Sequence, residues 1–536
     1  MIKLRPRLDP IQPLSLRFSV LLAALSGVLY FAAFPGVGLW PLAGIALVPL
    51  LIGARNHTPR AAFLIGLVSG TTTACAGFWW LLEMLTRYSG FPLPLCVLFL
   101  LLLSTWQGAR MGIATWLAAR SERKGWPPEA SFVACFVASE ALFPLLFPWY
   151  FGCALQPVPV LIQGADLGGP MLLSASLAVV NVAIARTAIN VSLRKPLPRI
   201  TLAAAGAVMA LSAAYGWLRI RQVDAAAREA PALAIGLVQG NIPMDIQGRA
   251  AYRDAFDRQV RASHDLVRRG AQLVVWSESA FLYQVPEADA ERFVADSFAR
   301  ALGAPTLVGA LLYREQAGPT RTFNSALFFD RSAQLRGRYD KHHLLAFGEY
   351  IPLGETFPIL YKWSPESGHV TPGDRFENVS LDGHSIAILI CYEDILPGFV
   401  NTAVKSTQPE LLIDITNDAW FGQTAEPELH LALSQLRAVE QRRYLARAAN
   451  TGVSAIVDPV GRLTARTATF SEGALLGEVR WMKGKTLYQW LGDFPWYLVS
   501  FMAVLSAFWS RPGRRTPRPE SREPGKRGSE ATPEHL

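Results

Sequence analysis

Cysteine and charged residues are both scarce in this sequence. Five of its 536 residues are cysteine, and four of them lie in or beside apolar segments, so a disulfide-stabilised scaffold is excluded. Cys391 is the single cysteine of the polar part of the chain, where it is either a reactive thiol or a simply buried one. Charged residues make up 17% of the sequence and hydrophobic residues 51%, a balance too apolar for a large soluble protein. The composition therefore indicates a membrane protein.

A basic net charge does not point to nucleic acid in this chain. The formal net charge is +9, but Lys and Arg occur in short clusters between apolar runs and in the C-terminal tail. Membrane topology explains such clusters better than a nucleic-acid partner does.

Long apolar runs predict about eight transmembrane helices, because each is long enough to cross a bilayer. They cover residues 17–34, 38–54, 61–82, 93–118, 129–148, 163–185, 200–219 and 488–509. Arg110 and Glu140 fall inside two of these runs. Charges at such depth either pair between helices, mark a misplaced boundary or contact lipid headgroups, and the sequence leaves these alternatives open.

The distribution of Lys and Arg sets the expected orientation. Basic residues precede the first run and follow the second, fourth and sixth, whereas the opposite connections hold Arg87 alone. The positive-inside rule then places both termini in the cytoplasm and exports the segment between the seventh and eighth helices. The expected divisions are a cytoplasmic N-terminus at 1–16, a seven-helix bundle at 17–219, an exported domain at 220–487, an eighth helix at 488–509 and a disordered basic tail at 510–536.

The exported segment alternates short β-rich runs with helical patterns. Strands are predicted at 232–239, 272–276, 305–311, 325–330, 385–390, 411–416 and 454–458. Helices are predicted at 249–269, 287–302, 393–405 and 428–449. Such alternation is typical of an α/β domain.

Three polar residues follow strand-like runs, at the position where α/β folds present catalytic groups. They are Glu278 in LVVWSESAF, Lys341 in GRYDKHHLLAFGEYIP and Cys391 in IAILICYEDILPG. A thiolate can attack a carbonyl, a carboxylate can shuttle the proton, and an ammonium can stabilise the oxyanion.

Each of these residues also has an ordinary structural interpretation. Cys391 could be a buried core thiol, Glu278 an acid at a helix start, and Lys341 a surface ammonium. The neighbouring His342 and His343 could instead supply an imidazole base, but adjacent residues of an extended segment point to opposite faces. The histidines and Cys391 show no zinc-ligand spacing, so no metal site is predicted.

These segments resemble the nitrilase superfamily, and the whole chain resembles the apolipoprotein N-acyltransferase family. The resemblance runs from the apolar bundle through VQGNIP at 238–243, the three catalytic segments, ITNDAWFG at 415–422 and RAANTG at 447–452 to the final helix. It implies a helical membrane bundle joined to a nitrilase-like αββα sandwich.

The resemblance also implies roles for individual residues. Cys391 becomes the nucleophile, Glu278 the general base and later acid, and Lys341 the oxyanion stabiliser. Glu349 and Glu393 match family carboxylates that support the site, and Tyr392 is expected to shape the pocket beside them. No cofactor is expected.

Lipid contacts are predicted in two segments of the exported domain. Residues 350–373, which include Trp363, form a long irregular segment of the kind that often acts as a lid. Trp420 and Phe421 lie in a loop rich in turn residues, which favours acyl-chain contact over a core position. Family members often carry a tryptophan shortly after VQGNIP, whereas Met244–Ala250 contains none.

The reaction implied by the resemblance takes place at the outer face of the bacterial inner membrane. An acyl chain passes from a phospholipid to Cys391, and from that thioester to the N-terminal α-amine of a diacylglyceryl-cysteine apolipoprotein. The alternatives are a membrane-tethered amidase that uses the same three residues and an inactive membrane scaffold for lipoprotein sorting.

Overall fold

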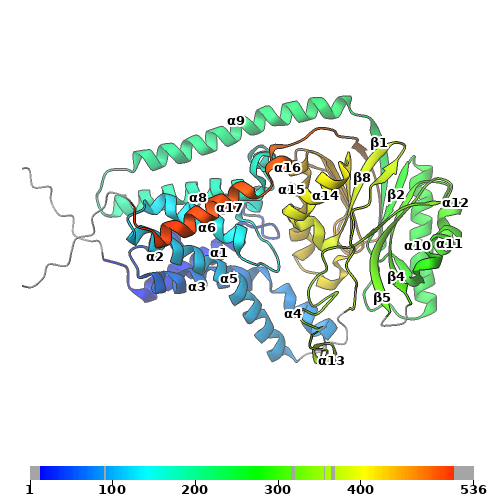
Figure 1. The fold of residues 1–536 in the computed structure, drawn as a ribbon, viewed down its shortest axis with the longest axis horizontal. Helices are drawn as coiled ribbons and strands as arrows, with labels where there is room; N and C mark the ends of the chain where they lie inside the picture. The colour runs from blue at the N-terminus through cyan, green and yellow to red at the C-terminus, as the bar shows by residue number, and fades with distance from the viewer. Residues whose placement is uncertain (1–11, 90–91, 316–319, 355, 364–367, 512–536) are drawn as a thin grey trace, which may run out of the picture.

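The computed structural model describes residues 12–89, 92–315, 320–354, 356–363 and 368–511. A helical bundle occupies one end of the elongated molecule, and two stacked sheets occupy the other (Figure 1). The long helix α9 (Arg199–Glu229) runs along the side of the bundle and leads to the first strand, β1 (Ala232–Gln239). The last helix, α17 (Phe494–Phe508), returns to the bundle and packs against α6 (Pro128–Leu142).

The bundle contains the first nine α-helices and the last two. Besides α6, α9 and α17, its elements are α1 (Leu16–Ala33), η1 (Trp40–Gly44), α2 (Val48–Ala54), α3 (Pro59–Gly77), α4 (Trp80–Met84), the π-helical turn η2 (Leu85–Ser89), α5 (Leu93–Arg123), η3 (Phe151–Leu155), α7 (Pro159–Ile162), α8 (Ala165–Ser192) and α16 (Leu487–Leu491). Glycines bring α3 and α5 into backbone contact. A Cβ at Gly70 would lie 2.4 Å from the carbonyl oxygen of Gly108, so a larger residue there would separate the helices.

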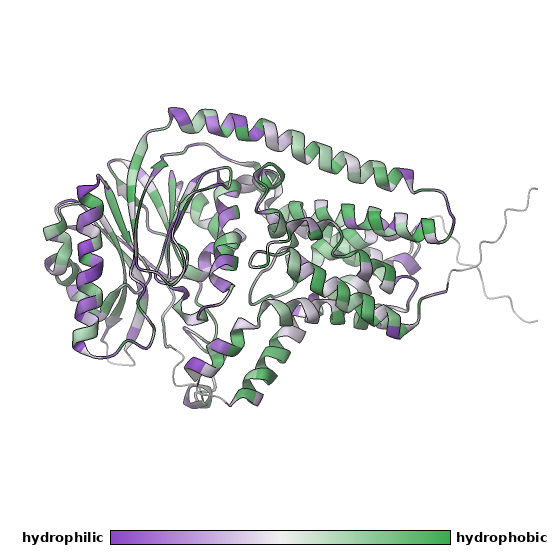
Figure 2. Cartoon of the chain, turned by 180° about the vertical axis from the view of Figure 1, so that it is seen from behind, coloured by the Kyte–Doolittle hydropathy of each residue, from purple (hydrophilic) through white to green (hydrophobic). Residues whose placement is uncertain are grey.

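Hydrophobic residues predominate along the helices of the bundle (Figure 2). Among the described residues, α1, α5, α8 and α9 are long and apolar enough to cross a membrane, and α3 with the helix at Trp80–Arg87 makes a fifth candidate bent by 52°. Residues Trp40–Ala54 and α17 are shorter apolar helices.

Each of the eight predicted runs contains a helix, so the predicted count is roughly confirmed. The run at 129–148 differs in length, because its helix ends at Leu142. Phe143 is extended there, as expected of a residue before a proline.

Two sheets form the second half of the molecule. The first has the order β13-β1-β2-β4-β5-β6 with β3 paired to β4, and the second has the order β12-β11-β10-β9-β8-β7. The strands of the first sheet after β1 are β2 (Leu273–Trp276), β3 (Phe281–Pro286), β4 (Thr306–Arg314), β5 (Arg321–Phe329), β6 (Leu335–Asp340) and β13 (Gly473–Arg480). Those of the second are β7 (Val379–Leu381), β8 (His384–Ile390), β9 (Leu411–Thr416), β10 (Tyr444–Ala449), β11 (Ala455–Val457) and β12 (Leu463–Arg466).

The sheets pack face to face over an apolar core that includes Ile235, Val275, Ile388 and Ile413. Helices α10 (Arg249–Arg268), α11 (Ala290–Val294) and α12 (Arg300–Leu302), with η4 (Glu287–Asp289) and η5 (Ala295–Ala299), cover the first sheet. Helices α14 (Pro397–Thr407) and α15 (Glu426–Gln441) cover the second (Figure 1). The short elements η6 (Cys391–Ile395), η7 (Asp418–Phe421) and α13 (Ile359–Trp363) lie in the connections. This is the predicted helical bundle with an αββα sandwich.

One predicted helix is wrong over its last third. The pattern at 428–449 predicts a single helix, but α15 ends at Gln441 and residues 444–449 form β10. Arg442 adopts a left-handed conformation with φ of 50°, which terminates the helix. The following residues then pair with β9 in the middle of the second sheet, where pairing on both edges overrides local helical preference.

Candidate active site

The ends of three strands bring Glu278, Lys341 and Cys391 together. Glu278 follows β2, Lys341 follows β6, and Cys391 follows β8, so the first two come from one sheet and the thiol from the other. All three are buried, with exposed fractions of 6%, 2% and 7%. Cys391 has a φ of 55°, the left-handed region that non-glycine residues rarely adopt. Backbone strain of this kind clusters at active sites but also occurs at helix ends such as Arg442, so it is consistent with a functional role for Cys391 without requiring one.

Lys341 lies between two carboxylates. Its Nζ is 3.2 Å from Oε1 of Glu278 and 2.8 Å from Oε2 of Glu349. Asn324 donates to both carboxylates, at 2.6 Å to Glu278 and 2.8 Å to Glu349. The Lys341 ammonium therefore contacts both carboxylates, and the Asn324 amide donates a hydrogen bond to each of them, which fixes their relative position.

The pKa values of the thiol and the ammonium respond to this burial and charge. Burial raises the pKa of the Cys391 thiol well above its usual value and Glu278 raises it further, while Lys341 and a hydrogen bond with Thr416 oppose the shift. Burial lowers the pKa of Lys341, but the charges of Glu278, Glu349 and Cys391 outweigh burial and raise it well above its usual value. The ammonium is thus charged and the thiol protonated at rest, so a base must remove the thiol proton when a substrate binds.

Glu393 links the turn at Cys391 to the segment that carries Lys341. Its carboxylate accepts hydrogen bonds from the Tyr339 hydroxyl at 2.8 Å and from the backbone N–H groups of His342, His343 and Ile390 at 2.6, 3.1 and 2.9 Å. Burial raises the pKa of Glu393 to about 7 in spite of these donors. Because the donors come from both sheets, this carboxyl fixes the position of Cys391 relative to Lys341.

A second buried charge cluster lies on the other side of Cys391. His430 contacts Asp418 through Nδ1 at 2.8 Å and Asp394 through Nε2 at 3.0 Å. Arg447 lies 3.3 Å from Asp394, 3.3 Å from Asp414 and 3.5 Å from Asp418. Asp414 in turn accepts the backbone N–H of Cys391 at 3.1 Å.

The charges of this cluster balance. Burial lowers the pKa of His430, but Asp394 and Asp418 raise it well above its usual value, so the ring is an imidazolium. Burial and the charge of Asp394 raise the pKa of Asp414 well above its usual value. The cations lower the pKa values of Asp394 and Asp418 against the effect of burial. Two cations therefore face two carboxylates and one neutral carboxyl.

Asp418, Glu426 and His430 place ligand atoms within 4.8 Å of one another, a spacing that could hold a metal ion. Both ring nitrogens of His430 contact carboxylates, so a metal ion would have to displace one of these contacts. A protonated imidazole is also not a ligand. The residues present therefore favour an ion-pair cluster over a metal centre.

A small cavity of about 20 Å³ opens onto Cys391 between the sandwich and the bundle. Its apolar walls come from both parts of the molecule and are formed by Trp80, Phe147, Trp149, Leu345, Tyr392, Ile395, Phe421, Leu429 and Leu433. Glu426 and His430 supply its polar groups. The Cys391 thiol therefore lies in a mainly apolar space at the junction with the apolar bundle.

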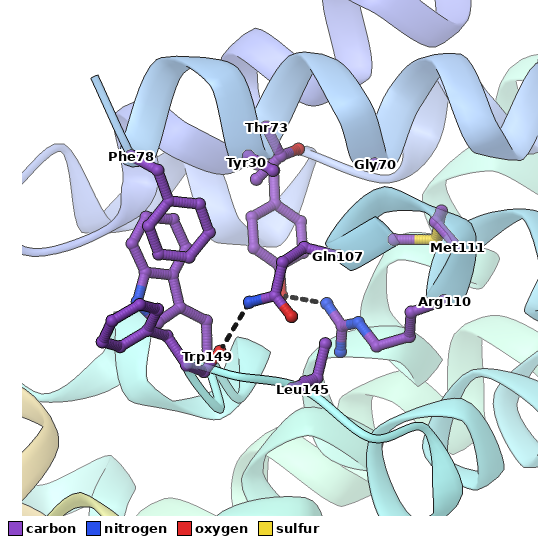
Figure 3. A pocket seen from close by; sticks show the side chains of 11 residues that line it. Tyr30, Gly70, Thr73, Phe78, Gln107, Arg110, Met111, Leu145 and Trp149 are labelled. Atoms are coloured by element: carbon purple, nitrogen blue, oxygen red, sulfur yellow. Dashed lines mark hydrogen bonds between the residues drawn. The ribbon is translucent and has the colours of Figure 1, made fainter. Parts of the chain in front are cut away.

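Figure 3 shows a second cavity, of about 30 Å³, that shares Phe147 and Trp149 with the first. Gln107 of α5 points into it and donates to the carbonyl oxygen of Phe147 at 3.0 Å. Tyr392 donates from its hydroxyl to the carbonyl oxygen of Leu146 at 2.5 Å. The loop between α6 and η3 is thus hydrogen-bonded both to α5 of the bundle and to Tyr392, the residue after Cys391.

Arg110 and Glu140 form an interhelical ion pair beside this second cavity. Arg110 Nη1 lies 2.8 Å from Oε1 of Glu140, and its Nη2 donates to the Tyr30 hydroxyl at 3.2 Å. Both residues are buried. The sequence leaves open whether these two charges pair between helices, mark a misplaced boundary or contact headgroups. The structure shows that they pair between helices.

The alternative roles of Glu278 and Lys341 do not fit their surroundings, whereas Cys391 is buried in the apolar core between the sheets, as its alternative role also requires. No helix starts at Glu278, and Lys341 is buried. His342 and His343 line a different cavity, of about 520 Å³, which does not include Cys391 among its lining residues. Among the described residues, the charges of Glu278 and Lys341 have the largest effect on the pKa of the Cys391 thiol.

The predicted lipid-contact residues have different surroundings. Phe421 is buried and lines the Cys391 cavity, with its ring edge-on to Trp80 at 4.9 Å. Trp420 is partly buried and packs against the bundle core. The side chain of Trp363, with residues 355 and 364–367 of the predicted lid and the tail from 512, lies outside what the structure describes.

Sequence reasoning missed Asn324 beside Lys341 and the whole of the second cluster. Asn324, Asp394, Asp414, Asp418, Glu426, His430 and Arg447 were not predicted as site residues. A polar residue inside an apolar strand, such as Asp414 in LLIDIT or Arg447 in YLARAA, is the signal that could have found two of them, because buried charges need partners.

Comparisons with known proteins agree with this architecture. Residues 26–183 match the model of the apolipoprotein N-acyltransferase N-terminal domain, and residues 234–483 match the carbon-nitrogen hydrolase model. An apolipoprotein N-acyltransferase of Geobacter metallireducens is 32% identical over 92% of this chain and 95% of its own length. One of Gloeobacter violaceus is 32% identical over 96% of this chain and 98% of its own length.

Among solved structures, an amidase from Nesterenkonia sp. is 21% identical, with a TM-score of 0.35 over 47% of this chain and 91% of that one. The relatives matched over nearly their full length, together with the two family models, identify the chain as a member of the apolipoprotein N-acyltransferase family.

Proposed function

We propose that this chain moves an acyl chain from a phospholipid to the N-terminal α-amine of a diacylglyceryl-cysteine apolipoprotein, through a thioester on Cys391. The observation that carries the proposal is the buried thiol beside a Lys341 ammonium shared by two carboxylates, in an apolar cavity at the junction with the bundle. The family membership supports the acyltransferase class and a lipid and lipoprotein pair of substrates.

The first half-reaction forms the thioester. Glu278 takes the proton of the Cys391 thiol, and the thiolate attacks the ester carbonyl of the phospholipid. Lys341 stabilises the tetrahedral oxyanion, because its charge is already fixed by Glu278 and Glu349 and needs no reorganisation. As the C–O bond breaks, Glu278 returns the proton to the leaving oxygen, and a lysophospholipid departs.

The second half-reaction forms the amide. The neutral α-amine attacks the thioester carbonyl, Lys341 again stabilises the oxyanion, and the C–S bond breaks. Glu278 takes one of the two nitrogen protons and passes it to the departing sulfur, which restores the thiol, and the other proton stays on the amide. Two chemically separate steps on one nucleophile predict ping-pong kinetics.

The surface around the site suits a lipid substrate. Exposed apolar side chains gather on the described part of the segment that follows Lys341, at Phe347, Leu353, Phe357 and Ile359. Extraction of an acyl chain from the bilayer costs ~0.8 kcal/mol per CH₂, so a site that meets the chain at the headgroup level avoids most of this cost. We infer that residues 350–373 shield the thioester from water as a lid.

The proposed topology keeps the sequence-based divisions. Residues 17–219 and 488–509 span the inner membrane of a bacterium, residues 220–487 lie on the periplasmic side, and residues 1–16 and 510–536 lie in the cytoplasm. Cysteine substitutions at exposed positions such as Arg268 and Lys483 should react with a membrane-impermeant thiol reagent in intact spheroplasts. If these cysteines reacted only after the membrane had been disrupted, residues 220–487 would lie on the cytoplasmic side and the proposed orientation would be wrong.

A donor–acceptor assay tests the function. The full-length protein is reconstituted with phospholipid that carries a labelled acyl chain, and a synthetic diacylglyceryl lipopeptide with a free α-amine is added. The expected result is one labelled amide and one lysophospholipid for each turnover. Release of ammonia from small amides without chain transfer would instead establish an amidase. If the protein catalysed neither reaction, the inactive scaffold would be the remaining alternative.

A further inference from the structure

Glu426 is a buried carboxyl that the mechanism above does not use. It begins α15, its side chain is 9% exposed, and it lines the same cavity of about 20 Å³ as Cys391. Its Oε2 has no hydrogen-bond partner among the described residues. Its other oxygen, Oε1, lies 4.0 Å from Nδ1 of His430, beyond hydrogen-bond reach.

This carboxyl contrasts with its neighbours. Glu393 accepts four hydrogen bonds, and Asp394 and Asp418 are each held by both His430 and Arg447. A buried polar atom without a partner costs free energy and is uncommon in folded proteins. A vacant acceptor that faces the nucleophile therefore suggests a donor that arrives with the substrate.

We propose that Glu426 receives the α-ammonium of the acceptor lipopeptide and removes one proton from it, so that the neutral amine can attack the acyl-Cys391 thioester. The inference rests on the proposed function, and it assigns a residue to the second half-reaction alone. The donor phospholipid ester carries no proton for Glu426 to remove.

The size of the space agrees with this role. A cavity needs ~10–15 Å³ to hold a water molecule, so about 20 Å³ admits a group the size of one ammonium. Its apolar walls suit the hydrocarbon next to the amine. The hydrocarbon chains themselves remain on the bundle side, where Trp80, Phe147 and Trp149 contribute the wall.

The charges around Glu426 favour a proton acceptor. The groups that face it are Asp418 of η7 and His430 of its own helix, with Asp394 of η6 and Arg447 of β10 behind them. Burial and Asp418 raise its pKa to about 8, close to the ~7.7–8.0 of an α-amino group. An arriving cation favours the ionised carboxylate, and near-equal affinities for the proton allow transfer in either direction.

The protons balance over the step. The ammonium gives one proton to the Glu426 carboxylate, and the neutral amine attacks the carbonyl carbon while the C–S bond breaks. The second nitrogen proton passes through Glu278 to the sulfur. Because its pKa is about 8, the Glu426 carboxyl is protonated before the substrate binds; it releases that proton to water as the ammonium arrives, and the proton taken from the ammonium then restores the carboxyl.

The test separates the two half-reactions in the full-length protein. Wild type and Glu426→Gln are loaded with labelled phospholipid, the acyl-Cys391 thioester is quantified by mass spectrometry, and a diacylglyceryl lipopeptide is then added at pH 6.5 and at pH 9. The glutamine variant should load as fast as wild type. Its transfer should be about 100-fold slower at pH 6.5, the size of a general-base contribution, and within about threefold of wild type at pH 9, where the amine is already neutral.

Two further variants make the result unambiguous. Glu428→Gln changes an exposed carboxyl in the same helical turn, which is paired with Arg466, and should match wild type in both steps. Glu426→Asp keeps a carboxyl that is one methylene shorter, so it should transfer at an intermediate rate with the same recovery at pH 9.

Three outcomes would overturn one claim or the other. Wild-type transfer by Glu426→Gln at pH 6.5 would exclude the proposed base. If the rates of thioester formation and of acyl transfer both fell in Glu426→Gln at both pH values, Glu426 would have a structural role only. A wild-type enzyme that forms no thioester would instead refute the proposed function itself.

Discussion

Two buried charge clusters flank the Cys391 turn, and they differ in balance. On one side the Lys341 ammonium faces the carboxylates of Glu278 and Glu349, so one negative charge is in excess. On the other side His430 and Arg447 face Asp394 and Asp418, and Asp414 carries its proton, so the charges cancel. An excess carboxylate can accept a proton, whereas a balanced cluster holds its members in place. We therefore expect the first cluster to act in catalysis and the second to act as a scaffold.

Removal of the thiol should have the largest effect. Cys391→Ser replaces the nucleophile with a hydroxyl that is harder to ionise and gives an ester that is a poorer donor to amines. Transfer to the lipopeptide should fall by about 10³-fold or more, measured as labelled amide per enzyme. Cys75→Ser, in α3 of the bundle, should leave the rate unchanged. Normal transfer by the Cys391 variant would remove this thiol from the reaction.

Loss of the shared cation should reduce the rate of both half-reactions. Lys341→Met leaves Glu278 and Glu349 facing each other and removes the oxyanion partner. The rate constants for thioester formation and for transfer should each fall by about 10²- to 10³-fold in single-turnover assays. Lys483→Met, whose ammonium is 75% exposed, is the matched control. A variant that loses only one of the two steps would contradict the shared role.

The balanced cluster should respond in stability. Arg447→Met leaves three buried acidic residues without their guanidinium and should lower the free energy of unfolding by about 3 kcal/mol. Thermal unfolding of the detergent-solubilised protein measures the difference. Arg466→Met, which removes an exposed pair with Glu428, should change it by about 0–1 kcal/mol. If both arginine variants unfold at the same temperature as wild type, the scaffold role is wrong.

The smallest expected effect is a pH dependence that involves Glu393. Its pKa is about 7, against about 4.3 in an unfolded chain, so the folded protein binds its proton more tightly. Its contribution to stability is therefore complete below about pH 4 and is lost as the pH rises through about 7.

Glu393→Gln should therefore reduce the loss of stability between pH 5 and pH 7.5 by more than about 1 kcal/mol, measured by thermal unfolding at both pH values. Glu428→Gln should keep the wild-type slope. Equal slopes for wild type and Glu393→Gln would mean that this carboxyl does not titrate in that range.

The sequence predicted the catalytic side of this comparison better than the scaffold side. Glu278 and Cys391 each follow an apolar strand that local pattern can recognise, whereas Lys341 follows the polar strand β6 and its role was identified through the resemblance to the family. Asp394, Asp414, His430 and Arg447 come from four separate elements, and their pairing exists only after the second sheet forms. Local pattern carries no information about such partners.

Local sequence pattern also failed to predict the boundary between α15 and β10. Residues 428–441 are helical as predicted, but Tyr444–Ala449 becomes a central strand because β9 and β11 pair with both of its edges. In the bundle, the helix at Pro128–Leu142 is shorter than its apolar run because Pro144 extends the preceding residue. Both errors lie where long-range pairing or a single proline decides the outcome.

Mass spectrometry of the Cys391 peptide, from protein incubated with phospholipid of known acyl composition, tests the central claim most directly. The account predicts an added acyl mass on Cys391 that hydroxylamine removes and that disappears when lipopeptide is supplied. Unmodified Cys391 in a preparation that N-acylates the lipopeptide at full rate would contradict it.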